Sequence, residues 1–390
     1  MNFIAFSFVM FSCWFPTGFS ATFSSLAFFF ALPLFFYRVQ WATIGLFEKA
    51  GLALFGWLSL SILWSQAGVL ESLGYLSEYR IYFMVPVISV ALRCLPATTK
   101  WSVVAALTGG IVALIASYGL GLGFWTIEGA LYSMGAKIYH GFIMSTLMLV
   151  ALLIARNMTG VHRAGFILLS ILIAYNVLNI ETGRTGYLQV IATILIFLGL
   201  TFGRKQAFIL VVITAFSFGT AYWTLERFNG RVNETLANVE RVFLSDDIRS
   251  STGHRLEFYR GALKIAGENP LVGVGVGDVS SELANLAKKG EIRVTTDNVH
   301  SEFLNMLIAG GAPALFLFLG FVCSIVWTGV LNRRRDAAVG DALITLAAIV
   351  FISALFNSTI KDYGEKHALI IILSILASKV NFLPRREFIG

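Results

Sequence analysis

Long, nearly uncharged apolar runs follow one another along almost the whole sequence, and this feature limits the possible folds most strongly. A helix needs about 20 mostly apolar residues to cross roughly 30 Å of hydrocarbon, where every backbone group must be satisfied internally. The runs are continuous, unlike the alternating segments of about 10 residues in an outer-membrane barrel. The sequence therefore predicts an all-α polytopic membrane protein. A content of 57% hydrophobic and 13% charged residues excludes a soluble enzyme of this length.

The apolar runs predict about twelve transmembrane helices. They are expected near residues 3–16, 18–37, 50–66, 79–95, 101–119, 138–155, 163–179, 186–202, 206–223, 303–330, 341–360 and 366–380. The first run has no basic segment before it and a second span follows at once, so we interpret it as a retained helix. The tenth run contains Gly310, Gly311 and Pro313, which predict a kink or a tilt.

Basic residues predict how the helices are oriented. Short cytoplasmic loops are enriched in Lys and Arg, and with the N-terminus inside, every cytoplasmic loop between spans carries at least two. The sequence thus favours an N-in/C-in arrangement, and the net charge of +7 reports topology instead of nucleic-acid binding. Three parts are expected: helices one to nine over 1–223, a periplasmic loop over 224–302, and helices ten to twelve with a short tail over 303–390.

The loop over 224–302 is the one long polar stretch of the sequence. Apolar residues at helical spacing predict a helix over 252–267, so the loop is expected to be partly helical and to fold over the outer mouth of the bundle.

Arg184 lies in the sequence GRTG at the outer junction of the seventh and eighth spans. The small residues around it allow a bulky substrate to approach the backbone, and its guanidinium offers a planar set of donors to phosphate. The alternatives are an arginine that reaches the membrane interface, or an ion pair with Glu181. Position alone does not separate these interpretations.

Arg260 lies in the long loop, before the stretch NPLVGVGVGD. It is a second candidate for an anion site, and the alternative is a solvated loop helix in which Glu257 lies beside it. The run Gly273, Gly275 and Gly277 lacks the Lys-Ser/Thr of a P-loop, so we interpret it as a flexible or tightly turned lip of the site.

His300 lies in the sequence DNVHSEF, where the long loop returns to the membrane. Histidine is the usual general base near neutral pH, and Asp297 or Glu302 is a candidate to orient it. A metal site formed by all three is an alternative, although residues of one short stretch make a poor cage. A histidine without chemistry at the start of a helix is another.

Arg80 and Lys137 are outer-side cations at the starts of the fourth and sixth spans. Each is either an anchor to lipid phosphate or an additional substrate-binding residue.

The GRTG turn at Arg184, the stretch from Arg260 to NPLVGVGVGD, and DNVHSEFLNMLIAGG after a long outer loop together resemble the bacterial O-antigen ligase family. The resemblance covers about residues 180–320, and the wider superfamily includes O-antigen polymerases and protein O-oligosaccharyltransferases. It implies a fold similar to the C-type glycosyltransferases. It also implies a multi-pass protein of the Gram-negative inner membrane with its active site facing the periplasm.

The resemblance implies transfer of a glycan from undecaprenyl pyrophosphate to a sugar of the lipid A–core oligosaccharide, with inversion. No metal or other cofactor is expected. Fixed cations then stabilise the leaving pyrophosphate, which suits Arg184 and Arg260, and a base deprotonates the acceptor hydroxyl, which suits His300. The implied partners are this donor, the lipid A–core acceptor and membrane lipids, without nucleic acid.

Other functions stay open at this stage. An O-antigen polymerase and a protein O-oligosaccharyltransferase lie within the same superfamily. A twelve-helix secondary transporter is the alternative from another class. Transporters often show internal repeats, and none is visible in this sequence.

Overall fold

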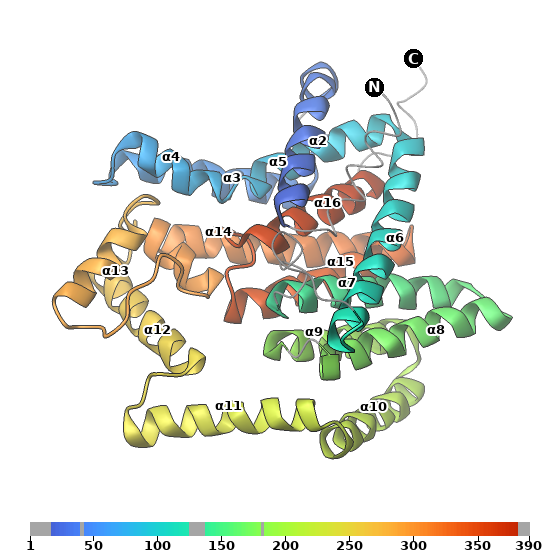
Figure 1. Ribbon diagram of the computed structural model, residues 1–390. Coiled ribbons are helices and arrows are strands. Elements are labelled where there is room, and N and C mark those ends of the chain that lie inside the picture. The colour runs from blue at the N-terminus through green and yellow to red at the C-terminus, as the bar shows by residue number, and fades with distance from the viewer. Residues whose placement is uncertain (1–16, 40–42, 125–136, 181–182, 381–390) are drawn as a thin grey trace.

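The computed structural model describes residues 17–39, 43–124, 137–180 and 183–380, and helices are the regular elements of these ranges (Figure 1). In chain order they are α2 (Thr17–Arg38), α3 (Leu46–Leu60), α4 (Val69–Ser77), α5 (Ile81–Cys94), α6 (Pro96–Gly121), α7 (Lys137–Asn157), α8 (Gly160–Tyr175), α9 (Arg184–Thr201), α10 (Arg204–Thr224), α11 (Glu226–Ser245), α12 (Ser251–Glu268), α13 (Val279–Lys288), α14 (Glu302–Asn332), α15 (Ala337–Phe356) and α16 (Tyr363–Lys379).

Eight of the described helices are long and apolar enough to cross a membrane, namely α3, α6, α7, α8, α9, α10, α14 and α15. Shorter apolar stretches lie in α2 and α5, and α16 coincides with the expected span at 366–380. The all-α polytopic class is therefore confirmed. The number of twelve spans and the N-in/C-in orientation stay predictions, and the expected span at 3–16 lies outside the described residues.

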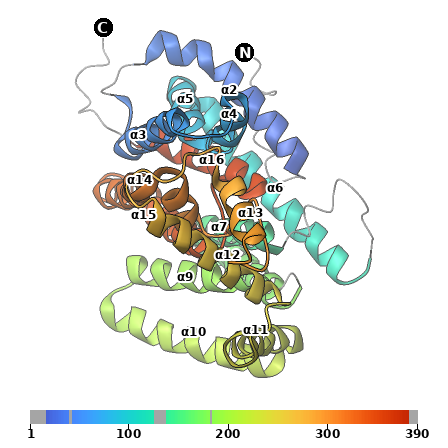
Figure 2. The same ribbon diagram turned by 90° about the vertical axis from the view of Figure 1, so that its left-hand side faces the viewer.

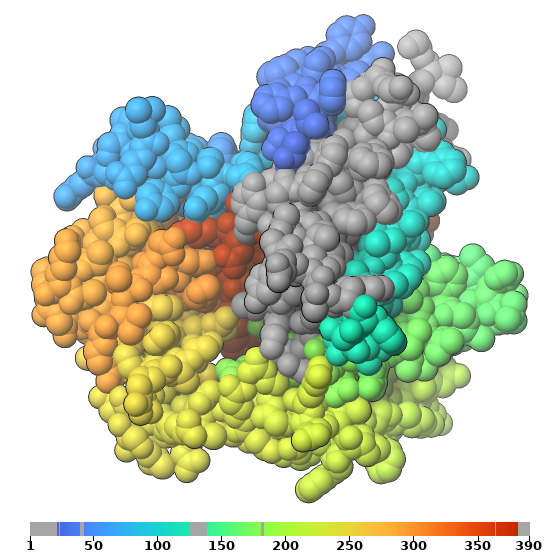
Figure 3. Space-filling view, in the orientation of Figure 1, coloured from blue at the N-terminus to red at the C-terminus, as the bar shows by residue number. Residues whose placement is uncertain are grey.

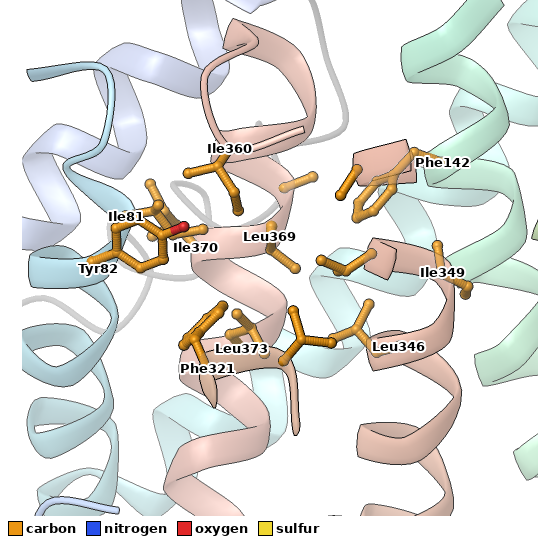
Figure 4. Packing of buried hydrophobic residues seen from close by; sticks show 14 of the residues in the cluster. Ile81, Tyr82, Phe142, Phe321, Leu346, Ile349, Ile360, Leu369, Ile370 and Leu373 are labelled. Carbon is orange, nitrogen blue, oxygen red and sulfur yellow. The ribbon is translucent and has the colours of Figure 1, made fainter. Parts of the chain in front are cut away.

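The core lies between α5, α7, α14, α15 and α16. Figure 4 shows Leu369 and Leu373 between Phe321 on one side and Leu346 on the other. Leu346 is fully buried. Along the same core, the rings of Tyr82 and Phe321 meet edge to face with centroids 5.2 Å apart. This packing joins α5, α14, α15 and α16 in one hydrophobic core.

Helix α10, at the edge of the bundle, is packed differently. None of the described residues of α10 is buried, and its main neighbours are α9 and α11 (Figure 2). Its exposed side chains, such as Phe208, Phe216 and Trp223, suit a helix that faces lipid.

The long loop is partly helical, as the sequence predicts. The expected helix over 252–267 corresponds to α12, which begins where the Ser250 hydroxyl accepts a hydrogen bond from the N–H of Gly253. Both α12 and α13 gather at the end of the bundle where α14 begins (Figure 1).

The expected kink in α14 is confirmed at Gly311, which has φ 68° and ψ −165°. Pro313 has no N–H to donate to the carbonyl of Ala309 one turn earlier, and that carbonyl instead accepts a hydrogen bond from the N–H of Gly275 at 3.1 Å. The neighbouring Ile308 carbonyl accepts one from Val274 at 2.8 Å. The segment 270–275 of the loop is therefore bonded into the break of a membrane helix.

The glycine run fits this arrangement. Gly273 and Gly275 have φ of +67° and +100°, in the left-handed region that favours glycine. A Cβ atom at Gly273 would collide with the backbone of α14, and one at Gly275 would collide with Ser65. The run is a tightly turned segment packed against α14 and the end of α3.

Candidate functional site

His300 lies in the turn directly before α14 and has a constrained backbone. Its φ of +56° is uncommon for a residue with a side chain. Its N–H donates to Oδ1 of Asn298 at 3.0 Å, and its carbonyl accepts from the hydroxyl of Tyr259 on α12 at 3.2 Å. Contacts from its own turn and from α12 therefore hold the backbone of this residue.

The imidazole of His300 is partly buried, and both positive and negative side chains act on it. Its ring lies 6.2 Å from the ring of Phe258, and its Nδ1 lies 3.4 Å from Oδ1 of Asn357. Burial lowers the pKa of His300 below its ordinary value, the positive charge of Arg255 lowers it further, and Asp362 opposes both. The ring is consequently neutral near neutral pH, which is the form that accepts a proton.

The turn between α15 and α16 surrounds His300, although it lies about sixty residues further along the chain. Asn298, beside His300, donates through Nδ2 to Oδ1 of Asp362 at 2.6 Å. Asn305 in the first turn of α14 donates to Oγ of Ser358 at 2.7 Å. Sequence reasoning missed this turn, because no local pattern marks it.

The structure places the two expected orienting carboxylates away from the ring nitrogens. Glu302 is fully buried, and its Oε2 accepts a hydrogen bond from the N–H of Ile360 at 3.1 Å. Asp297 is exposed and contributes the weakest of the fields that act on His300. Within the described ranges, Asn357 is the side chain hydrogen-bonded to the ring, and no group of three or more potential metal ligands occurs.

Arg184 is the first residue of α9, and its guanidinium faces α11 and α12. Nη1 donates to Oγ1 of Thr252 at 2.8 Å, and Nη2 lies 3.6 Å from Oε1 of Glu234. The side chains of Arg184 and Glu234 are 31% and 46% exposed, so solvent screens this ion pair. The alternative partner Glu181 lies outside the described residues.

Arg255 of α12 is a cation that the sequence reasoning missed. It acts electrostatically on both Arg184 and His300, so the two residues share one neighbour. Thr252, Arg255 and Tyr259 follow a three-then-four spacing and therefore lie on one face of α12. The sequence contains this spacing, but only the contact between Tyr259 and His300 in the structure shows that this face of α12 is turned toward the site.

Arg260 lies on another face of α12, about 140° around the helix from Arg255. Its side chain is 70% exposed, and Nη1 lies 3.8 Å from Oε1 of Glu257. Glu257 accepts shorter hydrogen bonds, at 2.9 and 3.0 Å, from the backbone and side chain of Arg293. The structure brings Arg184 and His300 to α12, whereas Arg260 points away from the contact face.

Arg80 directly precedes α5 and is held by α16. Its Nη2 lies 2.9 Å from Nε2 of buried His367, whose Nδ1 lies 2.6 Å from Oγ of Ser24 on α2. Arg80 thus belongs to a neighbouring polar contact between three helices. Lys137 begins α7, and its side chain lies outside the described residues.

Figure 3 shows the red segment, which includes α16, set back between the orange and yellow segments that include α13 and α12. The arrangement offers a neutral imidazole and nearby arginines at one end of the bundle, which is suited to an anionic substrate with a reacting hydroxyl.

Residues 168–319 match the family model described as O-antigen ligase. The match runs from within α8 through Arg184 and His300 to the kinked half of α14. The resemblance noted in the sequence is thereby confirmed, and it supports a glycosyltransferase-like enzyme of the O-antigen ligase and polymerase superfamily. No curated protein matches the sequence.

Proposed function

Because residues 168–319 carry an O-antigen ligase domain, we propose that the protein transfers a glycan from undecaprenyl pyrophosphate to a sugar hydroxyl of lipid A–core oligosaccharide. One observation supports this most strongly. Helix α12 contacts Arg184 through Thr252 and His300 through Tyr259, and presents Arg255 on the same face. Cations for a pyrophosphate and a base for a hydroxyl are thus organised by one helix.

In the proposed reaction, His300 takes the proton of the acceptor hydroxyl as its oxygen attacks the anomeric carbon. The bond between that carbon and the pyrophosphate oxygen breaks, and undecaprenyl pyrophosphate leaves with the bonding electrons. Arg184 and Arg255 stabilise the negative charge that develops on the leaving group. Direct displacement inverts the anomeric centre, and cleavage of the activated glycosyl–phosphate bond drives the transfer.

The remaining expected residues have peripheral roles in this proposal. Arg260, exposed on α12, meets the donor only at the rim of the site. Arg80 and Lys137 stay candidates for additional substrate contacts, and Asp297 and Glu302 support the turn that carries His300. Membrane lipids surround the bundle, and the proposed location is the inner membrane with this end facing the periplasm.

A reconstituted transfer reaction tests the proposal. Purified protein in liposomes is given undecaprenyl-pyrophosphate glycan and lipid A–core in the presence of EDTA, and the lipids are separated on a gel. A lipid A–core band shifted by the mass of the glycan is expected. A donor that grows longer instead would indicate a polymerase, and glycan on an added protein acceptor would indicate an oligosaccharyltransferase. No covalent change in any acceptor, with solute uptake by the same vesicles, would favour a transporter.

A further inference from the structure

Asn357, the residue directly after α15, connects His300 to a buried carboxyl group. Its side chain is 1% exposed, and Nδ2 donates to Oε1 of Glu365 at 2.8 Å. Glu365 lies in the first turn of α16 and is 3% exposed. The other atom of the amide, Oδ1, faces Nδ1 of His300 at 3.4 Å.

The direction of these bonds determines where the imidazole carries its hydrogen. An amide NH₂ only donates and an amide oxygen only accepts, and with Nδ2 donating to Glu365 the oxygen of Asn357 faces His300. A carbonyl oxygen can bond Nδ1 only when that nitrogen carries a hydrogen. In a neutral imidazole the lone pair then lies on Nε2.

Three further contacts limit the movement of His300. The left-handed backbone of His300 is fixed by the hydrogen bond that its N–H donates to Asn298 and by the one that its carbonyl accepts from Tyr259. The ring of Phe258 limits its rotation on one side. The orientation of the imidazole therefore does not depend on the long contact with Asn357 alone.

We propose that Asn357, anchored by Glu365, is a positioning residue that keeps His300 in its Nδ1–H tautomer and makes Nε2 the proton-accepting atom. The catalytic meaning of this inference rests on the proposed function, whereas the tautomer is a property of the resting protein. The first test therefore uses no substrate. Solid-state ¹⁵N NMR of histidine-labelled protein in bilayers should show a protonated Nδ1 for His300, which is one of five histidines and is identified by signal loss in His300→Gln. A protonated Nε2 in the wild-type protein would overturn the inference.

Asn357→Leu supplies the functional test, because it keeps the approximate shape and removes both hydrogen bonds. The expected kcat is about 10- to 100-fold lower, as for other residues that orient a reacting group, while KM for the donor changes less than about threefold. The fraction of Nδ1–H tautomer should fall in the same variant. An unchanged tautomer with unchanged kcat would remove Asn357 from this role.

Matched variants separate positioning from general damage. Glu365→Gln keeps an acceptor for the amide of Asn357 and should restore most of the activity lost in Glu365→Leu. Asn332→Leu removes another buried asparagine at the far end of α14 and should leave kcat unaltered. An equal loss in Asn332→Leu would contradict a specific role. If wild-type protein transferred no glycan but showed the Nδ1–H tautomer, the proposed function would fail and the tautomer assignment would stand.

Discussion

The surroundings of His300 and those of Arg184 are built in contrasting ways. Around His300 the polar side chains are buried and tied to the turn after α15 or to α16: Asn305 and Asn357 are each 1% exposed, and Glu302 is fully buried. Around Arg184 the main ionic partner, Glu234, is 46% exposed and belongs to a helix at the edge of the bundle. The proposed base is thus preorganised, whereas the proposed phosphate-binding cation lies in an adaptable region.

This contrast has an energetic reason. An exposed ion pair is worth about 0–1 kcal/mol, so Arg184 gives up Glu234 at little cost when a phosphate arrives. Leaving a buried polar group unsatisfied costs about 1–3 kcal/mol, so the network around His300 resists rearrangement. The proposed binding of a large donor requires an adaptable cation, and the proposed proton transfer over a short distance requires a fixed base.

The largest expected effect concerns His300 itself. His300→Ala should lower kcat by about 10²–10⁴-fold even at saturating donor, because a general base acts in the chemical step. Initial rates in the reconstituted transfer assay measure this, with thermal unfolding as the control for folding. A defect confined to KM would assign His300 to binding and would weaken the contrast between the two regions.

The next effect concerns Arg184. Arg184→Ala should lower kcat/KM by about 10²–10³-fold, since one donor to the developing charge is lost. Arg184→Lys should recover only part of this, because an ammonium lacks the planar pair of donors. The same assay over a range of donor concentrations gives both values, and full activity of Arg184→Ala would exclude it from the site.

A comparison within α12 sharpens the assignment of the second cation. Arg255→Ala should lower kcat/KM by about 10²-fold, whereas Arg260→Ala should lower it less than about fivefold, because Arg260 is 70% exposed. Both variants remove one arginine from one helix, so each controls for the other. A larger loss in Arg260→Ala would restore the role predicted from the sequence.

The pH dependence should show a smaller effect. Burial and Arg255 lower the pKa of His300, so the base stays neutral and the activity persists below pH of about 6.5. Removing the positive charge in Arg255→Gln should raise this pKa and move the acidic limb of the kcat/KM profile to higher pH. Asp362→Asn should move it to lower pH, because a negative charge that favours imidazolium is lost. Identical acidic limbs in all three proteins would show that another group sets the profile.

The smallest expected effect is that of Glu234→Gln. Removing a screened competitor for Arg184 should lower KM for the donor about two- to threefold and leave kcat unchanged. Arg249, whose ion pair with Asp247 lies on the same loop, provides a control: Asp247→Asn should not alter KM. A large loss of activity in Glu234→Gln would mean that the cation side is as preorganised as the base side.

Much of the fold follows from the sequence, because apolar length and the Pro313 kink are local properties. Arg184 and His300 stand out for a similar reason, as polar residues at the ends of apolar runs. Arg255 was missed because its proposed role depends on which face of α12 is turned inward. Arg255 and Arg260 are five positions apart and therefore lie on different faces of this helix. Asn357 and Glu365 were missed because Asn357 reaches His300 only through the packing of α15 against α14, and Glu365 reaches it only through Asn357.

The broken helix α14 has a consequence for biosynthesis. The carbonyls of Ile308 and Ala309 receive their hydrogen bonds from Val274 and Gly275, which leave the ribosome earlier. In lipid an unsatisfied carbonyl costs several kcal/mol, so α14 reaches a stable position only after the preceding segment has docked. Loop and helix therefore mature as one unit, and an insertion within 270–275 would act as a membrane-assembly defect before any substrate is bound.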